Sequence, residues 1–279
     1  MGKKLKVLEL FAGTRSIGKA FEKLGHEVYS VEMDEQHENI DWYADITKIS
    51  AYEIRERFGQ PDIVWASPPC QRFSVASIGH HWIKGTNDPK TKEAEEAMVM
   101  LRKTLDLINE LNPTYYFIEN PRGKMRKVEP MERLNRYTVT YCQYGDSRMK
   151  PTDIWTNHPN PRFRPICKNG APCHVSAPRG SQTGTQGLKG SVLRSIIPEE
   201  LCDHIAEISE DEPMDTRYRL VDIQDETDVT ENVTLEYLQD FLTHMFTEDE
   251  FDDLRFFLMT FQEVNASLEG IDYYAEEMD

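Results

Sequence analysis

The stretch "LKVLELFAGTRSIGKAFEKLGHEVYSVEMD" (residues 5–34) decides the fold, because it combines a strand, a turn, a helix and a second strand. "LKVLEL" (5–10) is an apolar run of the length of a buried strand. "SIGKAFEKLG" (16–25) has helical apolar spacing and ends at a glycine, and "EVYSVEMD" (27–34) returns to a strand pattern. Two strands joined by a helix predict a crossover connection and a parallel pair.

The same alternation continues to about residue 157. Further strands are predicted at "WYADI" (42–46), "PDIVWAS" (61–67) and "TYYFIEN" (114–120), with helices at 50–58 and 90–112, and a closing strand pair at 136–145 and 153–157. The sequence therefore predicts an α/β fold with a largely parallel sheet and helices on both faces.

The rest of the chain has a different composition. Residues 158–190 are rich in Pro, Gly, Arg and Lys, which is loop chemistry, and a helical pattern resumes after Pro198. Residues 234–246 and 247–261 each carry an apolar face, which predicts an acidic helical C-terminal extension. We expect four parts: a catalytic domain (1–157), a short basic recognition region (158–190), a helix returning to the first domain (191–209) and the extension (210–279).

Charge is distributed unevenly along the chain. The net charge is −17, yet residues 205–279 hold 23 acidic and 3 basic residues, whereas residues 122–194 hold 14 basic and 4 acidic ones. Such asymmetry suggests partners. The basic stretch is either a solvated face or a surface that follows nucleic-acid phosphates.

The cysteines and the hydropathy of the chain indicate the kind of compartment in which it works. The five cysteines are odd in number and scattered, and neither a secretory leader nor a membrane-spanning stretch is evident. We therefore expect a soluble protein of a reducing, cytoplasmic compartment, with no membrane partner.

Polar residues follow the predicted strands, at the edge where ligands of parallel sheets bind. Gly13 and Gly18 flank a turn at a helix N-terminus, which suits an anionic group. Glu32 is placed to accept the hydroxyls of a ribose, and Asp45 an exocyclic amine. Taken singly, the glycines are equally compatible with an ordinary turn, and a solvated surface carboxylate is the better interpretation of Glu32.

The stretch "ASPPCQRFS" (66–74) is more specific. Two prolines fix the backbone directly before Cys70, an arrangement that a packing cysteine does not need and a nucleophilic thiolate does. "FIENP" (117–121) places Glu119 at the end of the next strand, where apolar neighbours raise the pKa of a carboxyl group and keep its proton available. The two residues predict a nucleophile and an acid in one pocket.

Together these motifs resemble those of DNA (cytosine-5) methyltransferases, in particular the compact forms of bacteriophages. "FAGTRSIG", Glu32, "ADI", "SPPCQRFS", "FIENP" and "CQYGDSRMKPT" follow the order of the family's motifs over residues 7–157. The resemblance implies a Rossmann-like methyltransferase sheet and S-adenosylmethionine as cofactor.

The resemblance also implies the reaction. Cys70 would add to C6 of a cytosine flipped out of double-stranded DNA, Glu119 would act at N3, and C5 would receive the methyl group. Arg148 would orient the base or its phosphate, and residues 71–85 would form a lid. The implied cofactor contacts are Phe11, Gly13, Thr14, Ser16, Ile17, Gly18, Glu32, Met33, Asp45 and Pro68.

Some features depart from the family pattern. Arg15 stands where a glycine is usual, and would either reach the cofactor's carboxylate or point to solvent. A recognition region of about 35 residues suggests a short target sequence or weak selectivity. The target sequence, and a role in restriction–modification or in regulation, stay open.

Three alternatives remain: a methyltransferase that acts on RNA, a transferase of another group to C5, and an inactive DNA-binding relative. We assign no metal ligand, because the spacing of Cys142, Cys167, Cys173 and His174 is unusual for zinc, but a zinc site at these residues stays open.

The acidic extension would compete with DNA for the basic surface or bind a protein partner; a packed cap is the other interpretation. If it competes, deletion of residues 210–279 tightens binding to a DNA duplex, most strongly at low salt, because salt screens charge. Fluorescence anisotropy at low and moderate salt measures this. Equal affinities of the full and shortened chains would exclude competition.

Overall fold

The computed structural model describes residues 3–176, 191–211, 218–222, 228–233, 238 and 273–277. The chain divides into two compact units, one of residues 1–132 and 136–211 and one of residues 133–135 and 212–279. Each unit is described by itself.

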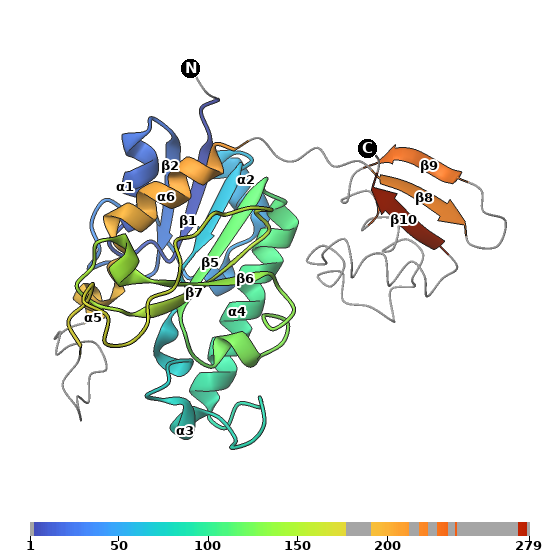
Figure 1. The fold of residues 1–279 in the computed structure, drawn as a ribbon. Coiled ribbons are helices and arrows are strands. Elements are labelled where there is room, and N and C mark those ends of the chain that lie inside the picture. The colour runs from blue at the N-terminus through green and yellow to red at the C-terminus, as the bar shows by residue number, and fades with distance from the viewer. Residues whose placement is uncertain are drawn as a thin grey trace. The chain divides into compact units, whose positions relative to one another are not determined.

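The first unit is built on a seven-stranded sheet with the order β3-β2-β1-β4-β5-β7-β6 (Figure 1). The strands are β1 (Lys6–Leu10), β2 (Glu27–Glu32), β3 (Trp42–Tyr43), β4 (Ile63–Ala66), β5 (Tyr115–Pro121), β6 (Arg136–Thr140) and β7 (Pro151–Thr156). The first five strands in this order, from β3 through β2, β1 and β4 to β5, pair in parallel. Strand β7 is antiparallel to both β5 and β6. The predicted Rossmann-like sheet and its closing strand pair are confirmed.

Helices cover both faces of this sheet. On one face α1 (Ser16–Lys23) packs against α6 (Glu199–Ser209), and α2 (Ala51–Phe58) and α4 (Lys92–Leu111) lie on the other (Figure 1). The short helices are α3 (Ile78–His81) and α5 (Ser191–Ser195). Helix α2 begins with a capping box, in which Ser50 and Glu53 each accept a hydrogen bond from the other's backbone amide.

The core explains why the central strands are apolar throughout. All four residues of β4 are buried, since neighbouring side chains point to opposite faces and helices cover both. Ile63 and Trp65 pack with Phe21 of α1 and Leu201 of α6 on one face. Burial of both faces holds the carboxyl ends of β1, β4 and β5 in fixed register.

A glycine allows two segments at this edge to approach closely. The amide of Lys124 donates a hydrogen bond of 2.7 Å to the carbonyl of Phe73, which joins the segment after β5 to the segment after β4. A Cβ atom on Gly123 would lie 2.2 Å from that carbonyl oxygen. Only glycine therefore fits at residue 123 without a shift of the backbone.

The described part of the second unit is an antiparallel sheet of β8 (Tyr218–Asp222), β9 (Asp228–Val233) and β10 (Tyr273–Glu277), in the order β10-β8-β9. The sequence analysis did not predict these strands, so the expectation of a purely helical extension needs correction. Strands β8 and β9 are neighbours in the chain, whereas the pairing of β10 with β8 joins distant segments, which local periodicity does not reveal. The two predicted helices (234–246 and 247–261) lie outside the described residues, apart from residue 238.

Among the helices of the described ranges, none has the length and apolar character needed to cross a membrane.

Gly123→Ala is expected to lower the free energy of unfolding by about 1–3 kcal/mol, because the new methyl group displaces the Phe73 carbonyl. Gly79→Ala is the control, since a Cβ atom at this exposed position in α3 meets nothing within 4 Å. Urea unfolding of both variants measures the difference. Equal stability of Gly123→Ala and the parent chain would contradict the close approach.

Candidate active site

A cavity of about 1120 Å³ opens at the carboxyl ends of the central strands. This volume is slightly above the range of about 300–1,000 Å³ that is typical of small-molecule pockets. Its lining falls into two ends, one around Phe11, Gly13 and Glu32 and one around Cys70 and Glu119.

The first end is formed by the turns after β1 and β2. The amide of Gly13, which has a φ of 49°, donates a hydrogen bond of 2.9 Å to one carboxylate oxygen of Glu32. The other oxygen of Glu32 accepts from the amides of Met33 (2.8 Å) and Asp34 (3.0 Å). Glu32 therefore holds both turns in place and still lines the cavity.

The structure brings most of the predicted cofactor contacts to this cavity. Those that line it are Phe11, Gly13, Thr14, Ser16, Glu32, Met33 and Pro68. Ile17, Gly18 and Asp45 are not among the lining residues. Ile17, on α1, is buried in the core. The Asp45 carboxylate accepts from the amide (3.0 Å) and hydroxyl (2.7 Å) of Thr47, so it caps the turn Ile46–Lys48.

Arg15 does neither of the two things expected of it. Its backbone is left-handed (φ 55°), its side chain is buried, and the guanidinium forms a close ion pair with Glu22 of α1. Its Nε atom lies 4.0 Å from Oε2 of Glu9. The side chain therefore points inward to acids of the protein, away from solvent.

Gly18 has a packing role in the same cluster. Its amide donates to Glu9 at 3.1 Å, and a Cβ atom there would lie 2.5 Å from the other Glu9 oxygen. Burial raises the pKa of Glu9 to about 7, against the opposing effects of the Gly18 amide and Arg15. Arg15 thus partly compensates a carboxylate that is buried beneath the cavity.

Cys70 begins a short 3₁₀ turn (Cys70–Arg72) directly after β4 and the two prolines. The buried side-chain amide of Asn120 donates a hydrogen bond of 2.8 Å to the carbonyl of Pro68, which ties this turn to β5. Cys70 lines the cavity. Burial and the nearby Glu119 raise the pKa of its thiol, whereas Lys150 and Arg194 act in the opposite direction.

Glu119 lies on β5 and is 6 % exposed. Burial raises the pKa of its carboxyl group; Lys150 and hydrogen bonds from Tyr141 and Ser67 oppose the shift. The Tyr141 hydroxyl lies 3.0 Å from Oε1. A thiol and a carboxyl group that keeps its proton above the usual pH therefore line one cavity.

Arg148 also lines the cavity, but its charge is already paired. Its guanidinium binds both carboxylate oxygens of Asp146, at 2.9 Å from Nε, and its NH groups approach the carbonyls of Leu193 (3.3 Å) and Ile196 (3.4 Å). Through these contacts Arg148 holds the segment around Asp146 against residues 193–196 in the wall of the cavity.

Lys150 is a site residue that the sequence analysis missed. It lines the cavity, its Nζ atom lies 4.4 Å from the centre of the Tyr141 ring and 3.0 Å from the Arg194 carbonyl, and burial lowers its pKa while Glu119 raises it. The only sequence signal was its place two residues after Arg148 in "DSRMK". Its proximity to Cys70 depends on the antiparallel insertion of β7, which the sequence does not encode locally.

The segment after Cys70 is anchored at both of its ends. Phe73 and Trp82 are buried against one another, and the indole NH of Trp82 donates a hydrogen bond of 2.7 Å to the Arg72 carbonyl. Between them Ser74, Val75 and Ala76 line the cavity, and Val75 is 72 % exposed. Whether this segment closes as a lid stays a prediction.

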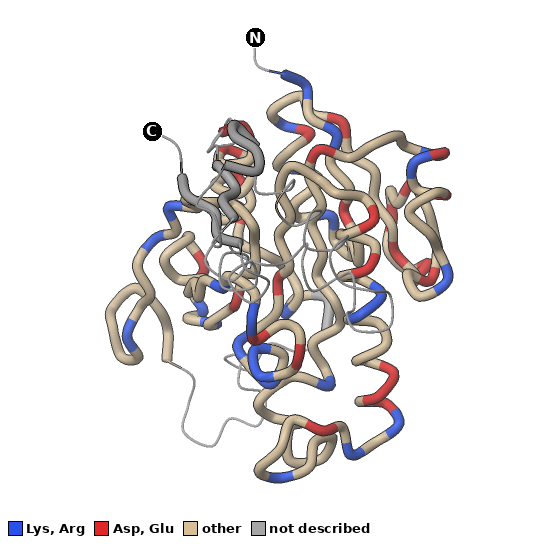
Figure 2. Tube along the Cα trace, turned by 90° about the vertical axis from the view of Figure 1, so that its right-hand side faces the viewer, with Lys and Arg blue, Asp and Glu red and all other residues tan. Residues whose placement is uncertain are grey.

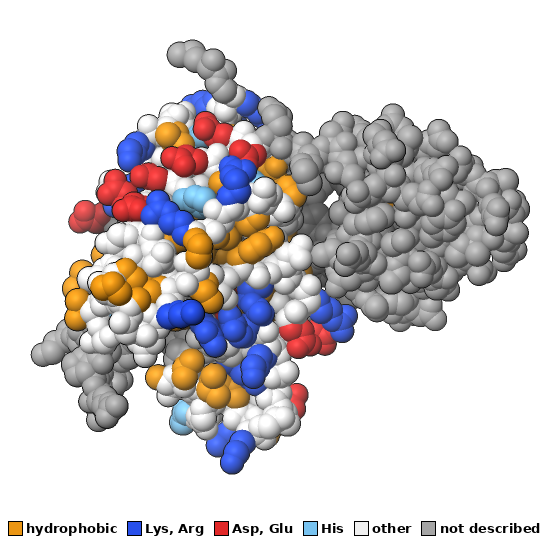
Figure 3. Space-filling view, in the orientation of Figure 1, with side chains coloured by type: hydrophobic (Ala, Val, Ile, Leu, Met, Phe, Trp, Pro, Cys, Tyr) orange, Lys and Arg blue, Asp and Glu red, His pale blue; other side chains and the backbone are white. Residues whose placement is uncertain are grey.

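Basic side chains gather near the cavity, where Arg122 and Arg194 belong to the lining. Figure 3 shows Lys and Arg side chains together across the middle and lower part of one face, with Asp and Glu towards its upper part. Figure 2 shows that Lys and Arg positions and Asp and Glu positions are both spread along the coloured part of the trace.

Comparison with known proteins gives the following relationships. A family model described as C-5 cytosine-specific DNA methylase matches residues 5–136. A frog virus 3 (isolate Goorha) protein named "Probable DNA (cytosine-5)-methyltransferase" is 32 % identical over 161 residues, which cover 55 % of this chain and 71 % of the relative.

Among solved structures, a proposed DNA modification methyltransferase encoded within an E. coli prophage is 18 % identical, with a TM-score of 0.43. The Dnmt2 methyltransferase of S. pombe is 15 % identical, with a TM-score of 0.39. Each match covers 55 % of this chain, and the chain spans about half the length of these two proteins (46 % and 48 %).

Lys150→Met is expected to raise the pKa of the Cys70 thiol further, because it removes the larger of the two positive influences on the thiolate. The rate of Cys70 alkylation against pH, followed by peptide mass mapping, measures this shift. Lys92→Met, at the exposed start of α4, is the control and leaves the profile unchanged. Identical profiles for Lys150→Met and the parent chain would refute the electrostatic role of Lys150.

Proposed function

Since this chain belongs to the C-5 cytosine-specific DNA methylase family, we propose that it transfers a methyl group from S-adenosylmethionine to C5 of cytosine in DNA. One observation carries the proposal: Cys70 and a carboxyl group with a raised pKa, Glu119, line the same cavity. Membership of the bacteriophage-type subgroup stays a prediction.

The first end of the cavity fits the cofactor. Its lining combines the aromatic ring of Phe11, the backbone turn at Gly13 and the carboxylate of Glu32, which suit a nucleoside with an amino-acid chain. When bound there, S-adenosylmethionine would supply an electrophilic methyl group. Three of the expected cofactor contacts do not line the cavity and would act by positioning the residues that do: Ile17, Gly18 and Asp45.

At the other end Cys70 would act as the nucleophile. Its thiolate would add to C6 of the cytosine, and Glu119 would donate its proton to N3, so that the ring becomes an enamine with a nucleophilic C5. The raised pKa of Glu119 keeps the required proton in place at neutral pH better than a solvated glutamate does. C5 would then bond to the methyl group as the bond between that group and the sulfonium sulfur breaks. Loss of the C5 proton to solvent, expulsion of the Cys70 thiolate and return of the N3 proton to Glu119 would restore the aromatic ring.

Lys150 would assist Cys70, because a positive charge beside the thiol favours the thiolate. Arg148, held by Asp146, would give the cavity wall a fixed position and contact the base or its phosphate. Since Cys70 must reach C6 from one face of the base while C5 receives the methyl group, the cytosine would have to leave the helical stack.

DNA would contact the basic region 122–194, with residues 158–190 as the target-recognition part and 71–85 as the lid. The basic side chains on the face of Figure 3 support a phosphate-following surface. The acidic extension would compete with DNA or bind another protein.

Incubation with cytosine-containing DNA and labelled S-adenosylmethionine is expected to yield 5-methylcytosine. Cys70→Ser is expected to reduce transfer to background, because a hydroxyl group is a much weaker nucleophile at neutral pH. Glu119→Gln is expected to lower the rate by about 10²–10⁴-fold, the usual contribution of a general acid.

Glu95→Gln, at an exposed site in the first turn of α4, makes the same chemical change away from the cavity and is expected to retain full activity. A parallel reaction with RNA of the same sequence separates the two nucleic acids. Failure of the parent chain to form 5-methylcytosine that depends on Cys70 would refute the proposal.

A further inference from the structure

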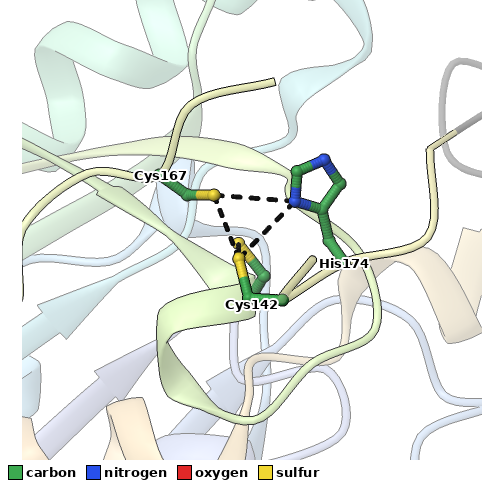
Figure 4. Close-up of side chains that lie close together, drawn as sticks. Cys142, Cys167 and His174 are labelled. Atoms are coloured by element: carbon green, nitrogen blue, oxygen red, sulfur yellow. Dashed lines mark hydrogen bonds between the residues drawn. The ribbon is translucent and has the colours of Figure 1, made fainter. Parts of the chain in front are cut away.

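Three cysteines and a histidine from two distant segments meet beside the cavity. Cys142 lies on the short turn Tyr141–Tyr144 after β6, whereas Cys167, Cys173 and His174 belong to the loop that follows β7. All four ligand atoms lie within 4.8 Å of one another. Figure 4 shows the Cys167 sulfur and the His174 ring turned towards the same point.

Three of the separations between the ligand atoms are close to the edges of a metal-centred tetrahedron. Metal–sulfur distances of about 2.3 Å and metal–nitrogen distances of about 2.0–2.1 Å require sulfurs about 3.8 Å apart and sulfur–nitrogen separations of about 3.6 Å. The Cys173–Cys142 sulfurs are 3.7 Å apart, and Nδ1 of His174 lies 3.5 Å from the Cys167 sulfur and 3.7 Å from the Cys173 sulfur. The Cys167–Cys173 separation is shorter, at 3.1 Å.

We infer that Cys142, Cys167, Cys173 and Nδ1 of His174 bind one zinc ion. Thiolate and imidazole ligands in a tetrahedral set are those that zinc prefers, and four protein ligands leave no open position, so the ion has a structural role. Binding releases the three thiol protons to solvent and forms three sulfur–metal bonds and one nitrogen–metal bond.

The surroundings hold these ligands in place without the ion. The amide of Cys167 donates a hydrogen bond of 2.9 Å to the hydroxyl of Thr140, and the amide of Val175 donates one of 2.9 Å to the Ser147 carbonyl. Both ends of the ligand loop are therefore fixed to the segment around β6. The side-chain amide of Gln143 lies 3.5 Å from the Cys173 sulfur, where it stabilises a thiolate. Such outer hydrogen bonds are typical of metal sites.

The unusual spacing that argued against zinc has a structural explanation. The amide of Ala171 donates to the Lys168 carbonyl at 3.2 Å, and Gly170 has a φ of 85°, so the five residues between Cys167 and Cys173 form a turn that returns the second sulfur to the first. The assignment of no metal ligand from the sequence is therefore replaced by this site.

A metal ion would add a link within this loop to the hydrogen bonds that hold its two ends. Residues 157–176 contain no helix or strand, and a long segment of this kind has little core of its own to hold it. Asn169, His174 and Val175 nevertheless line the cavity that Cys70 also lines. Zinc would fix this wall of the cavity; its effect on DNA binding rests on the proposed function, whereas the metal site does not.

Metal analysis of the full chain, purified without chelator from zinc-supplemented cells, is expected to find one zinc ion per chain. Cys173→Ser is expected to reduce the zinc content to background, because it removes one of four ligands at an exposed position where truncation leaves no buried cavity. Cys70→Ser, which removes a thiol outside the cluster, is expected to keep the metal. A thermal melt confirms that each variant is folded.

Exchange of the metal for Co(II) in the parent chain gives a second readout that needs no variant. Sulfur-to-cobalt charge-transfer bands and strong visible absorption of a tetrahedral ion are expected. Absence of both zinc and the cobalt spectrum, or a Cys167–Cys173 disulfide in freshly purified protein, would overturn the inference. Full zinc content in folded Cys173→Ser would also overturn it.

Discussion

The hydrogen bond from the Asn120 side chain to the Pro68 carbonyl joins the two strand ends on which the site depends. Neither strand end defines the site alone. Pro68 and Pro69 direct the chain off β4 towards Cys70, and Asn120 directly follows Glu119 on β5. Because β4 and β5 are parallel neighbours with fixed register, this one contact keeps a thiol and a carboxyl group on the same side of the cavity. Glu119 is buried and Cys70 is partly buried, and this burial raises the pKa of each.

Buried charge is balanced locally at both ends of the cavity. At the first end Arg15 lies between Glu9 and Glu22, and at the other Lys150 lies near Glu119 and Cys70. Each cation makes it less costly to bury an acid at a strand end. The left-handed backbone at Arg15 and the absence of a side chain at Gly18 both belong to this packing, because they allow the Glu9 carboxylate to lie against α1. A glycine at residue 15 would leave Glu9 without this partner.

Local signals in the sequence predicted much of this arrangement. Apolar runs and helical spacing gave the strands and helices of the first unit, and proline-flanked strand ends identified Cys70 and Glu119. What they did not predict depends on contacts between distant segments. The role of Lys150 requires β7 to pair antiparallel with β5, the inward direction of Arg15 requires Glu9 and Glu22 on neighbouring elements, and β10 pairs with β8 across some 50 residues. Asp45 was assigned to the cofactor because it follows a strand; its Oδ1 atom also accepts a hydrogen bond from the Thr47 hydroxyl, which the strand pattern did not predict.

The cysteine and histidine cluster is another feature that depends on contacts between distant segments, and it lies close to the catalytic end of the cavity. Cys142 and Cys167 are 25 residues apart, so their spacing alone does not predict a metal site. The turn at Gly170 and the hydrogen bond from Val175 to Ser147 bring the ligands together. That hydrogen bond ends one residue before Arg148, and Lys150 follows two residues later. The loop, the paired arginine and the lysine beside Cys70 therefore form one continuous wall. A metal ion at the cluster would therefore lie only a few residues along the chain from Lys150, the cation that favours the Cys70 thiolate.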